Sequence, residues 1–171
     1  MCSFKEKAEE GKPTVPFLYK GYRLYPIHPE HFSEYVVFMN ELLADTASAP
    51  VTEDSYEPLF NYYLHKYEEP HNRAFMVYKD DKIVGHFFIT DLLTNERAFI
   101  TLLELLKEHR NKGIGTGLMN VVETLVFQAK CSSIGLLVEQ GNERAIPFYK
   151  RLGYICDSRS EEGYLMVKNL Y

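Results

Sequence analysis

Three closely spaced glycines mark the part of this 171-residue sequence with the clearest chemical meaning. They lie in the segment Arg110-Asn111-Lys112-Gly113-Ile114-Gly115-Thr116-Gly117, between an apolar run at 99–106 and an amphipathic run at 118–130. We therefore expect a strand, a glycine-rich turn and the start of a helix in that order. Glycine lets the backbone approach a ligand and adopt positive φ, so that successive N–H groups at a helix N-terminus can converge on phosphate oxygens. The segment predicts a loop that binds a phosphorylated cofactor.

Two common phosphate-binding patterns do not fit this loop. The P-loop, G-x-x-x-x-G-K-S/T, requires a lysine followed by Ser or Thr, and no such pair follows the turn. In the dinucleotide pattern G-x-G-x-x-G, the third glycine comes one residue later than Gly117 does here. The spacing that fits is Arg or Gln, two residues, Gly, one residue, then Gly or Ala, through Arg110, Gly113 and Gly115. An ordinary glycine-bearing turn is the alternative explanation.

A second suggestive segment lies further along the chain. It follows a short apolar strand at 136–138 and reads NERAIPFYKRLGY from Asn142 to Tyr154. Asn142 suits the N-cap region of a helix, Pro147 is tolerated only in a first turn, and Gly153 suits the position just after a helix end. These residues predict a short helix at about 144–152.

Together the two segments resemble the cofactor loop and the later strand–helix unit of the GNAT superfamily of N-acetyltransferases. In that family the second segment follows N-x-x-A-x-x-F/L-Y-x-K/R-x-G-F/Y, and this sequence matches every specified position. The resemblance covers about residues 20–170. It implies a mixed, mostly antiparallel sheet with helices on both faces, and an enzyme that uses acetyl-CoA as a co-substrate.

The resemblance also implies where acetyl-CoA would bind. The backbone of the fourth strand would pair with the pantetheine arm, and an N–H there would polarise the thioester carbonyl, a contact worth about 3–4 kcal/mol in enzymes that depend on one. Lys107 stands where family members often carry proline. The pattern therefore does not decide whether the strands part at this point. The implied cofactor-binding residues are Leu105, Leu106, Lys107, Arg110, Asn111, Lys112, Gly113, Ile114, Gly115, Thr116, Asn142, Phe148 and Tyr149.

Some of these side chains have a simpler structural explanation. Arg110 and Lys112 would either contact the cofactor phosphates or remain solvated beside the turn. Asn142 would hydrogen-bond the cofactor arm, cap the helix, or do both.

Tyr149 occupies the position at which the family places its general acid. A phenol with a pKa near 10 can protonate a departing thiolate whose thiol has a pKa near 8.5. The alternative is a core tyrosine packed beside Phe148, one of 13 tyrosines in the chain.

The general base is less well defined by the pattern. An alkyl ammonium has a pKa near 10.4 and must lose a proton before it can attack. Many family members carry Glu nine residues before the loop arginine, where this chain has Thr101. Glu104 is the candidate base, although strand alternation could turn it away, and within an apolar run its charge needs a partner or a wet cleft. A water chain, Glu139 and His65 are the alternatives.

Composition bounds the class of protein. With 46% apolar and 25% charged residues, the chain resembles an ordinary globular domain with one core. No apolar run approaches the roughly 18 residues of a membrane span, and no signal-peptide pattern opens the sequence, which predicts a cytoplasmic protein. A net charge of −5 disfavours nucleic acid as a partner. Cys2, Cys131 and Cys156 lack metal-ligand spacing, which predicts free thiols and no metal site.

Residue periodicity places the remaining elements. We expect a loose arm at 1–17 before a single domain at 18–171. Strands are expected at 19–26, 74–78, 82–92 and 163–170, with helices at 30–44 and 56–67. Asp80-Asp81 predicts a hairpin turn, and Gly85 predicts a bulge or close packing. The resulting order is β-α-α-β-β-β-α-β-α-β-β, an α/β (α+β) fold.

The sequence as a whole predicts an N-acetyltransferase that moves an acetyl group from acetyl-CoA to a primary amine by direct attack in a ternary complex. No cysteine lies in either segment, so nothing indicates an acyl-enzyme. The acceptor, a small amine or a peptide amine, and the choice between monomer and homodimer stay open. Two alternatives are a non-catalytic acyl-CoA-binding regulatory or interaction domain, and an unrelated α/β domain that binds another phosphate ligand.

Overall fold

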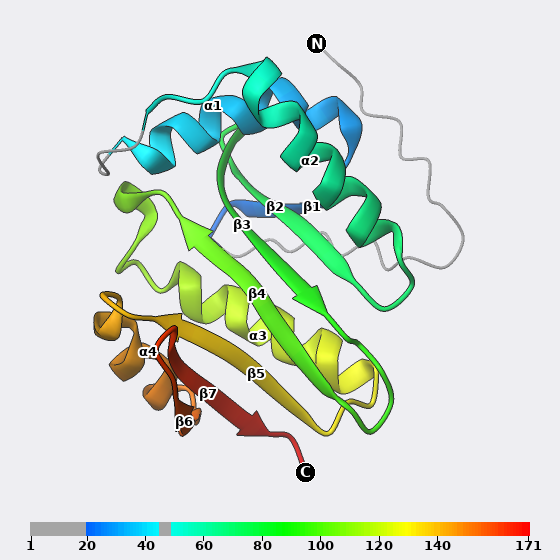
Figure 1. The fold of residues 1–171 in the computed structure, drawn as a ribbon, viewed down its shortest axis with the longest axis vertical. Coiled ribbons are helices and arrows are strands. Elements are labelled where there is room, and N and C mark those ends of the chain that lie inside the picture. The colour runs from blue at the N-terminus through cyan, green and yellow to red at the C-terminus, as the bar shows by residue number, and fades with distance from the viewer. Residues whose placement is uncertain (1–19, 45–48) are drawn as a thin grey trace.

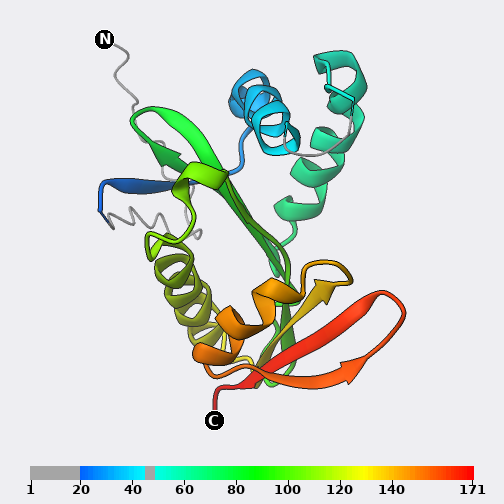
Figure 2. The same cartoon turned by 90° about the vertical axis from the view of Figure 1, so that its left-hand side faces the viewer.

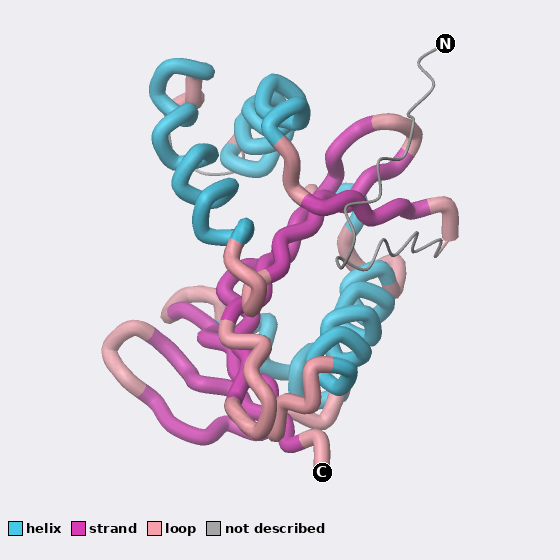
Figure 3. The backbone as a smooth tube through the Cα atoms, turned by 90° about the vertical axis from the view of Figure 1, so that its right-hand side faces the viewer, coloured by secondary structure: helices cyan, strands magenta, loops and turns pink. Residues whose placement is uncertain are grey.

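The computed structural model describes residues 20–44 and 49–171, so the arm expected at 1–17 lies outside the described residues. Seven strands form one sheet in the order β1-β2-β3-β4-β5-β7-β6. Helices α1 and α2 cover one face, and α3 and α4 cover the other (Figures 1 and 3). Every neighbouring pair is antiparallel except β4 and β5, which are parallel. This is the mixed, mostly antiparallel sheet that the sequence predicts.

The N-terminal half of the sheet is a meander of β1 (Tyr22–Pro26), β2 (Arg73–Lys79), β3 (Lys82–Thr90) and β4 (Arg97–Leu105). Asp80 and Asp81 form the predicted hairpin turn, with φ of 49° and 62°. Positive φ at both central residues is typical of a turn whose twist matches the flanking strands. The prediction of a strand at 82–92 was too long, because Asp91, at φ 60°, leaves the extended conformation.

Helices α1 (Phe32–Leu43) and α2 (Glu53–Glu68) lie between β1 and β2 in the chain. A 3-10 turn, η1 (Pro29–His31), precedes α1. Helix α2 begins three residues before the predicted 56, because Thr52 and Ser55 form a reciprocal cap. The Ser55 N–H donates to Thr52 Oγ1 over 3.2 Å, and the Thr52 N–H donates to Ser55 Oγ over 2.9 Å.

The C-terminal half contains η2 (Lys107–His109), α3 (Ile114–Gln128), β5 (Ser133–Glu139), η3 (Glu143–Ala145), α4 (Ile146–Arg151), β6 (Ile155–Arg159) and β7 (Gly163–Asn169). Gly153 ends α4 as predicted, with φ of 90°. Its N–H donates to the Lys150 carbonyl, and the Tyr154 N–H donates to the Tyr149 carbonyl. This pair of bonds is the Schellman ending that favours glycine. Figure 2 shows α4 packed beside the β6–β7 hairpin.

Strands β4 and β5 pair over only a short stretch and then part (Figure 1). The ladder joins Arg97–Ile100 to Ser133–Leu136. Beyond it, β4 continues to Leu105 on β3, and β5 continues to Glu139 on β7. The register against β3 passes from Leu102 to Ile100, so Thr101 is an extra residue, and such a bulge bends a strand. Lys107, in place of the family's proline, is therefore compatible with parted strands.

Gly85 is both beside a bulge and closely packed, as its sequence context predicts. The register between β2 and β3 shifts next to it. A Cβ at Gly85 would lie 2.6 Å from the Glu104 carbonyl oxygen and 2.5 Å from Leu105 Cδ2. Gly85 therefore lets β3 pack closely against the end of β4.

Among the described residues, no helix is both long enough and apolar enough to cross a membrane. The core fills both sides of the sheet. On one side, α1 and α2 bury Tyr35, Phe38 and Phe60 against the sheet. On the other side, α3 buries Leu118, Met119 and Val122.

We expect Gly85→Ala to lower the free energy of unfolding by about 1–3 kcal/mol, because the new methyl group meets the β4 backbone. Urea unfolding monitored by circular dichroism measures this as a lower midpoint at unchanged slope. Ser158→Ala, on the exposed edge strand β6, is the control and should stay within about 0.5 kcal/mol. Equal midpoints for Gly85→Ala and the unmodified chain would contradict the close packing.

Candidate active site

The glycine-rich segment forms the predicted turn between β4 and α3. Gly113 is the N-cap of α3 and has a left-handed conformation, with φ of 80°. The Gly117 N–H donates to the Gly113 carbonyl over 3.1 Å, which is the first helical bond. The N–H groups of Ile114, Gly115 and Thr116 precede that bond, and no side chain within the described part of the chain caps them. They form a set of backbone donors suited to an anion.

Arg110 ties this loop to the end of β4. Its Nε donates to the Leu105 carbonyl over 2.7 Å. The Leu106 N–H donates to the Val84 carbonyl on the β3 side, so strand alternation directs the N–H and carbonyl of Leu105 to the opposite edge. That edge is the one from which β5 has parted. The parted edge of β4 therefore presents backbone polar groups next to the loop.

Lysines surround the loop from other elements. Lys20 Nζ donates to the Lys112 carbonyl over 3.1 Å, and Lys79 Nζ donates to the Lys20 carbonyl over 3.4 Å. His109 Nδ1 lies 2.8 Å from the Tyr22 hydroxyl, and burial lowers the pKa of His109. Arg110 and Lys112 are exposed on the loop itself. Asp80, 3.8 Å from Lys79, and Glu108 lie in the same corner and offset part of this positive charge.

The two segments singled out in the sequence meet in space. A Cβ on Gly115 would lie 3.4 Å from Phe148 Cζ, so α4 packs directly against the start of α3. The Phe148 and Tyr149 rings are 5.0 Å apart, and burial raises the pKa of the Tyr149 phenol. Tyr149 is therefore protonated at neutral pH, as a proton donor must be.

Asn142 stands at the N-cap position of η3, but its side chain makes no capping hydrogen bond. Its N–H donates to the Glu139 carbonyl, which fixes the backbone at the end of β5. The exposed amide group is thus not used as a cap, one of the two roles that the sequence allows.

Glu104 is held by a partner that the sequence did not identify. Its Oε2 lies 2.7 Å from His86 Nε2, and its side chain is 41% exposed. His86 is only 1% exposed, and its Nδ1 lies 2.8 Å from the Tyr35 hydroxyl. His86 and Glu104 face each other across β3 and β4, so alternation does not turn Glu104 away. The signal for His86 was its place in the apolar run 83–89, because a buried polar side chain needs a partner.

Phenols of α2 complete the surroundings of Glu104. Burial, and then neighbouring groups that include the Glu104 charge, raise the pKa of Tyr56 to about 12. The same causes raise the pKa of Tyr63. A partly exposed carboxylate surrounded by protonated phenols can bind a cationic amine and can accept a proton from it.

The position where family members carry Glu, and the other two residues considered as a base, are less well placed. Thr101, at the family position, has its Oγ1 2.9 Å from the Tyr67 hydroxyl, and a hydroxyl offers no basic group at neutral pH. The His65 side chain is 92% exposed and lies 3.8 Å from Glu68. Glu139 is exposed at the end of β5. Of these residues, Glu104 alone combines partial burial with a fixed carboxylate.

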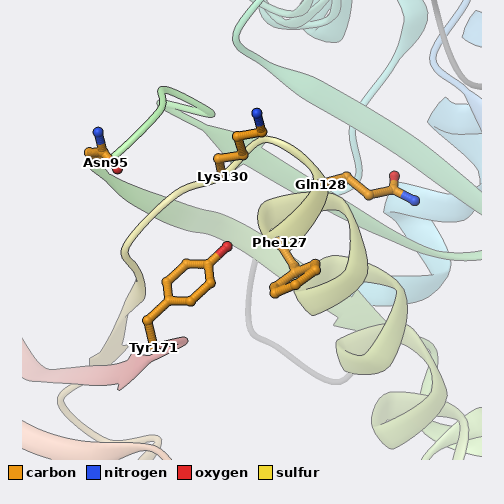
Figure 4. A pocket seen from close by; sticks show the side chains of 5 residues that line it. All are labelled: Asn95, Phe127, Gln128, Lys130 and Tyr171. Atoms are coloured by element: carbon orange, nitrogen blue, oxygen red, sulfur yellow. The ribbon is translucent and has the colours of Figure 1, made fainter.

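A cavity of about 560 Å³ lies near the C-terminal end of α3, at the far end of that helix from the loop (Figure 4). It is lined by Asn95, Phe127, Gln128, Lys130 and Tyr171. The Phe127 and Tyr171 rings stack 5.6 Å apart. Neither sequence segment contributes to this cavity, so we place the candidate active site at the parted strands instead.

Known proteins similar to this chain share both its sequence pattern and its fold. The sequence pattern of the acetyltransferase (GNAT) family matches residues 36–154. The N-alpha-acetyltransferase 30 of Schizosaccharomyces pombe is 27% identical over 137 residues, which are 76% of this chain and 89% of that protein. The human N-alpha-acetyltransferase 30 is 25% identical over 138 residues, 77% of this chain, but the match spans only 37% of the human protein.

Among solved structures, the PaiA N-acetyltransferase of Thermoplasma acidophilum in complex with coenzyme A superposes with a TM-score of 0.69. The match covers 86% of this chain and 98% of that one, at 18% identity. At this identity the likeness is one of fold.

We expect Gly115→Val to reduce the affinity for coenzyme A at least 10-fold while the domain stays folded, because the new side chain fills the approach to the first-turn N–H groups and crowds Phe148. Calorimetric titration with coenzyme A measures the affinity. Asn120→Val, exposed on the same helix beyond its first turn, should bind normally. Unchanged affinity in Gly115→Val would remove the loop from the cofactor site.

Proposed function

We propose that this chain, which belongs to the acetyltransferase (GNAT) family and is thus an acyltransferase, moves an acetyl group from acetyl-CoA to a primary amine by direct attack in a ternary complex. One observation carries the proposal: β4 and β5 part beside the glycine loop. We assign the base to a residue of β4 and the acid to a residue of the helix after β5. Glu104 comes from β4, and Tyr149 comes from α4, the helix that follows β5.

The residues present fit the co-substrate. The N–H groups of residues 114–116 and the lysines around the loop suit a pyrophosphate, and Gly115 has no side chain to block it. The Leu105 N–H on the parted edge suits an amide-containing arm, while the Leu105 carbonyl already accepts from Arg110. Acetyl-CoA supplies the acetyl group as an activated thioester. A fold neighbour crystallised with coenzyme A supports this assignment.

Glu104 and Tyr149 provide the proton path. Glu104 accepts a proton from the ammonium group, which leaves a neutral amine whose nitrogen forms the new bond to the acetyl carbon. The carbon–sulfur bond breaks, and Tyr149 gives its phenolic proton to the departing sulfur. The nitrogen that has formed the new bond loses its second proton to solvent as the amide forms. Solvent then returns a proton to Tyr149 and takes one from Glu104, whose side chain is partly exposed.

We propose a peptide α-amine as the first acceptor to test. The names of the two sequence relatives described above support it, since both are N-alpha-acetyltransferases. Proton chemistry supports it as well. An α-amino group has a pKa near 8, against about 10.4 for an alkyl amine, so its deprotonation is easier by roughly 3 kcal/mol. A carboxylate base is better matched to that smaller demand.

Release of free coenzyme A separates catalysis from binding alone. Acetyl-CoA is incubated with peptides of different N-terminal residues and with small amines, and free thiol is measured. An enzyme gives acceptor-dependent release and an acetylated product by mass spectrometry. A domain that only binds acyl-CoA gives no release above the rate without enzyme, which would contradict the proposal.

We expect Tyr149→Phe to lower kcat by roughly 10²- to 10⁴-fold with little change in coenzyme A affinity, because only the phenolic proton is lost. Single-turnover measurements are needed so that product release does not mask the step. Tyr154→Phe, whose ring lies 5.9 Å from the Tyr149 ring, is the matched control and should change kcat less than about 2-fold. A full single-turnover rate in Tyr149→Phe would show that another group protonates the sulfur.

A further inference from the structure

Resting on the proposed function, we propose that Tyr35 and His86 are positioning residues that orient Glu104 for proton transfer. In this arrangement the Tyr35 hydroxyl donates to His86 Nδ1, which leaves the imidazole proton on Nε2. The Nε2–H group then donates to Oε2 of Glu104, and Oε1 is left to meet the amine. The three residues come from α1, β3 and β4, so the base is fixed by groups that neither sequence segment contains.

The contact distances place one hydrogen bond on each imidazole nitrogen, and the chemistry of the two partners assigns the protons. At 2.8 Å between the Tyr35 hydroxyl and Nδ1, and at 2.7 Å between Nε2 and Oε2, each gap holds one proton. Tyr35 is fully buried. Its pKa is raised mainly by this burial, and further by the phenols of Tyr56 and Tyr63 and the charge of Glu104. Tyr35 therefore keeps its proton, and Tyr56 is a second hydrogen-bond partner for its hydroxyl. In the proposed arrangement Nε2 donates to Glu104, because an ionised carboxylate can only accept, and Nδ1 accepts from Tyr35.

Packing holds the imidazole in this orientation. Its ring centroid lies 5.1 Å from those of Phe38 and Phe88, and 5.7 Å from that of Tyr35. A ring enclosed in this way cannot exchange its two nitrogens without moving α1. The titratable groups that face the pair are the phenols of Tyr35 on α1 and of Tyr56 and Tyr63 on α2.

The exposure of the three residues indicates a role beyond packing. A buried histidine that served only the core would be satisfied by buried partners, yet this chain of hydrogen bonds ends on a carboxylate that is 41% exposed. The bond fixes one carboxylate oxygen and prevents the side chain from turning into solvent. Pre-orientation of this kind is what a second residue contributes to a general base.

Nuclear magnetic resonance on the unliganded protein tests the proton arrangement without any turnover. Long-range ¹H–¹⁵N correlations of ¹⁵N-labelled histidine locate the imidazole proton. We expect His86 to be the Nε2–H tautomer at neutral pH, and Tyr35→Phe to give a mixture of tautomers because Nδ1 loses its donor. A proton on Nδ1 in the unmodified protein would overturn the proposal.

Kinetics with the best acceptor tests the positioning. We expect kcat to fall about 10-fold in Tyr35→Phe and about 100-fold in His86→Leu, within the range that general base catalysis contributes. His86→Gln should recover part of the loss, because its amide can still donate to Glu104. Coenzyme A affinity should be unchanged in every variant.

Tyr78→Phe is the matched control, because the Tyr78 hydroxyl donates to Glu34 over 2.7 Å at a place away from the parted strands. It should alter kcat less than 2-fold. Full turnover in both Tyr35→Phe and His86→Leu would overturn the positioning role. Absence of turnover by the unmodified enzyme with every amine would overturn the proposed function and this role with it, while normal coenzyme A binding in the same sample would exclude a misfolded protein as the cause.

Discussion

The short pairing of β4 with β5 is the constraint on which the rest of the site depends. The two strands are held closely where they meet, because a Cβ at Gly135 would lie only 2.8 Å from the Phe99 ring. The Thr101 bulge then bends β4, and each strand continues with a different neighbour. Backbone groups along the parted edge need partners other than β5. The Arg110 side chain donates to the Leu105 carbonyl. In our account the cofactor arm pairs with the remaining backbone groups on this edge of β4.

The two faces of the sheet would then serve different parts of the reaction. On the face covered by α3 and α4, the first turn of α3 and Phe148 form a compact unit around Gly115. On the face covered by α1 and α2, Tyr35 and His86 hold Glu104. An amine and a thioester could therefore approach the gap from opposite sides without competing for the same groups. Each side is rigid for its own reason, a helix start on one and a buried hydrogen-bonded chain on the other.

Sequence reasoning predicted the elements better than it predicted the partners of Glu104. The element order, the Asp80-Asp81 turn and the Gly153 helix end follow from local rules about periodicity and positive φ, the mostly antiparallel sheet follows from the family resemblance, and all are confirmed. The start of α2 was missed because Thr52 and Ser55 were not recognised as a capping pair. The roles of the loop and of Tyr149 remain predictions.

The chain from Tyr35 through His86 to Glu104 could not be predicted, because its members are separated by 51 and 18 residues. Tyr35 meets His86 through the packing of α1 on β3, and His86 meets Glu104 through the register of β3 on β4. Alternation also misled the placement of Glu104. The reasoning began from Thr101, and the bulge at that residue changes the count of faces along β4. A buried histidine inside an apolar strand was the one available signal, and it shows that a partner is needed without naming the partner.

Amide hydrogen exchange, measured residue by residue with and without saturating coenzyme A, tests the central claim most directly. The account predicts slowed exchange at Leu105 on the parted edge and at residues 114–116 in the first turn of α3, with no change in the β1–β2 pair. Protection confined to other parts of the molecule, such as the residues around Phe127 and Tyr171, would contradict it.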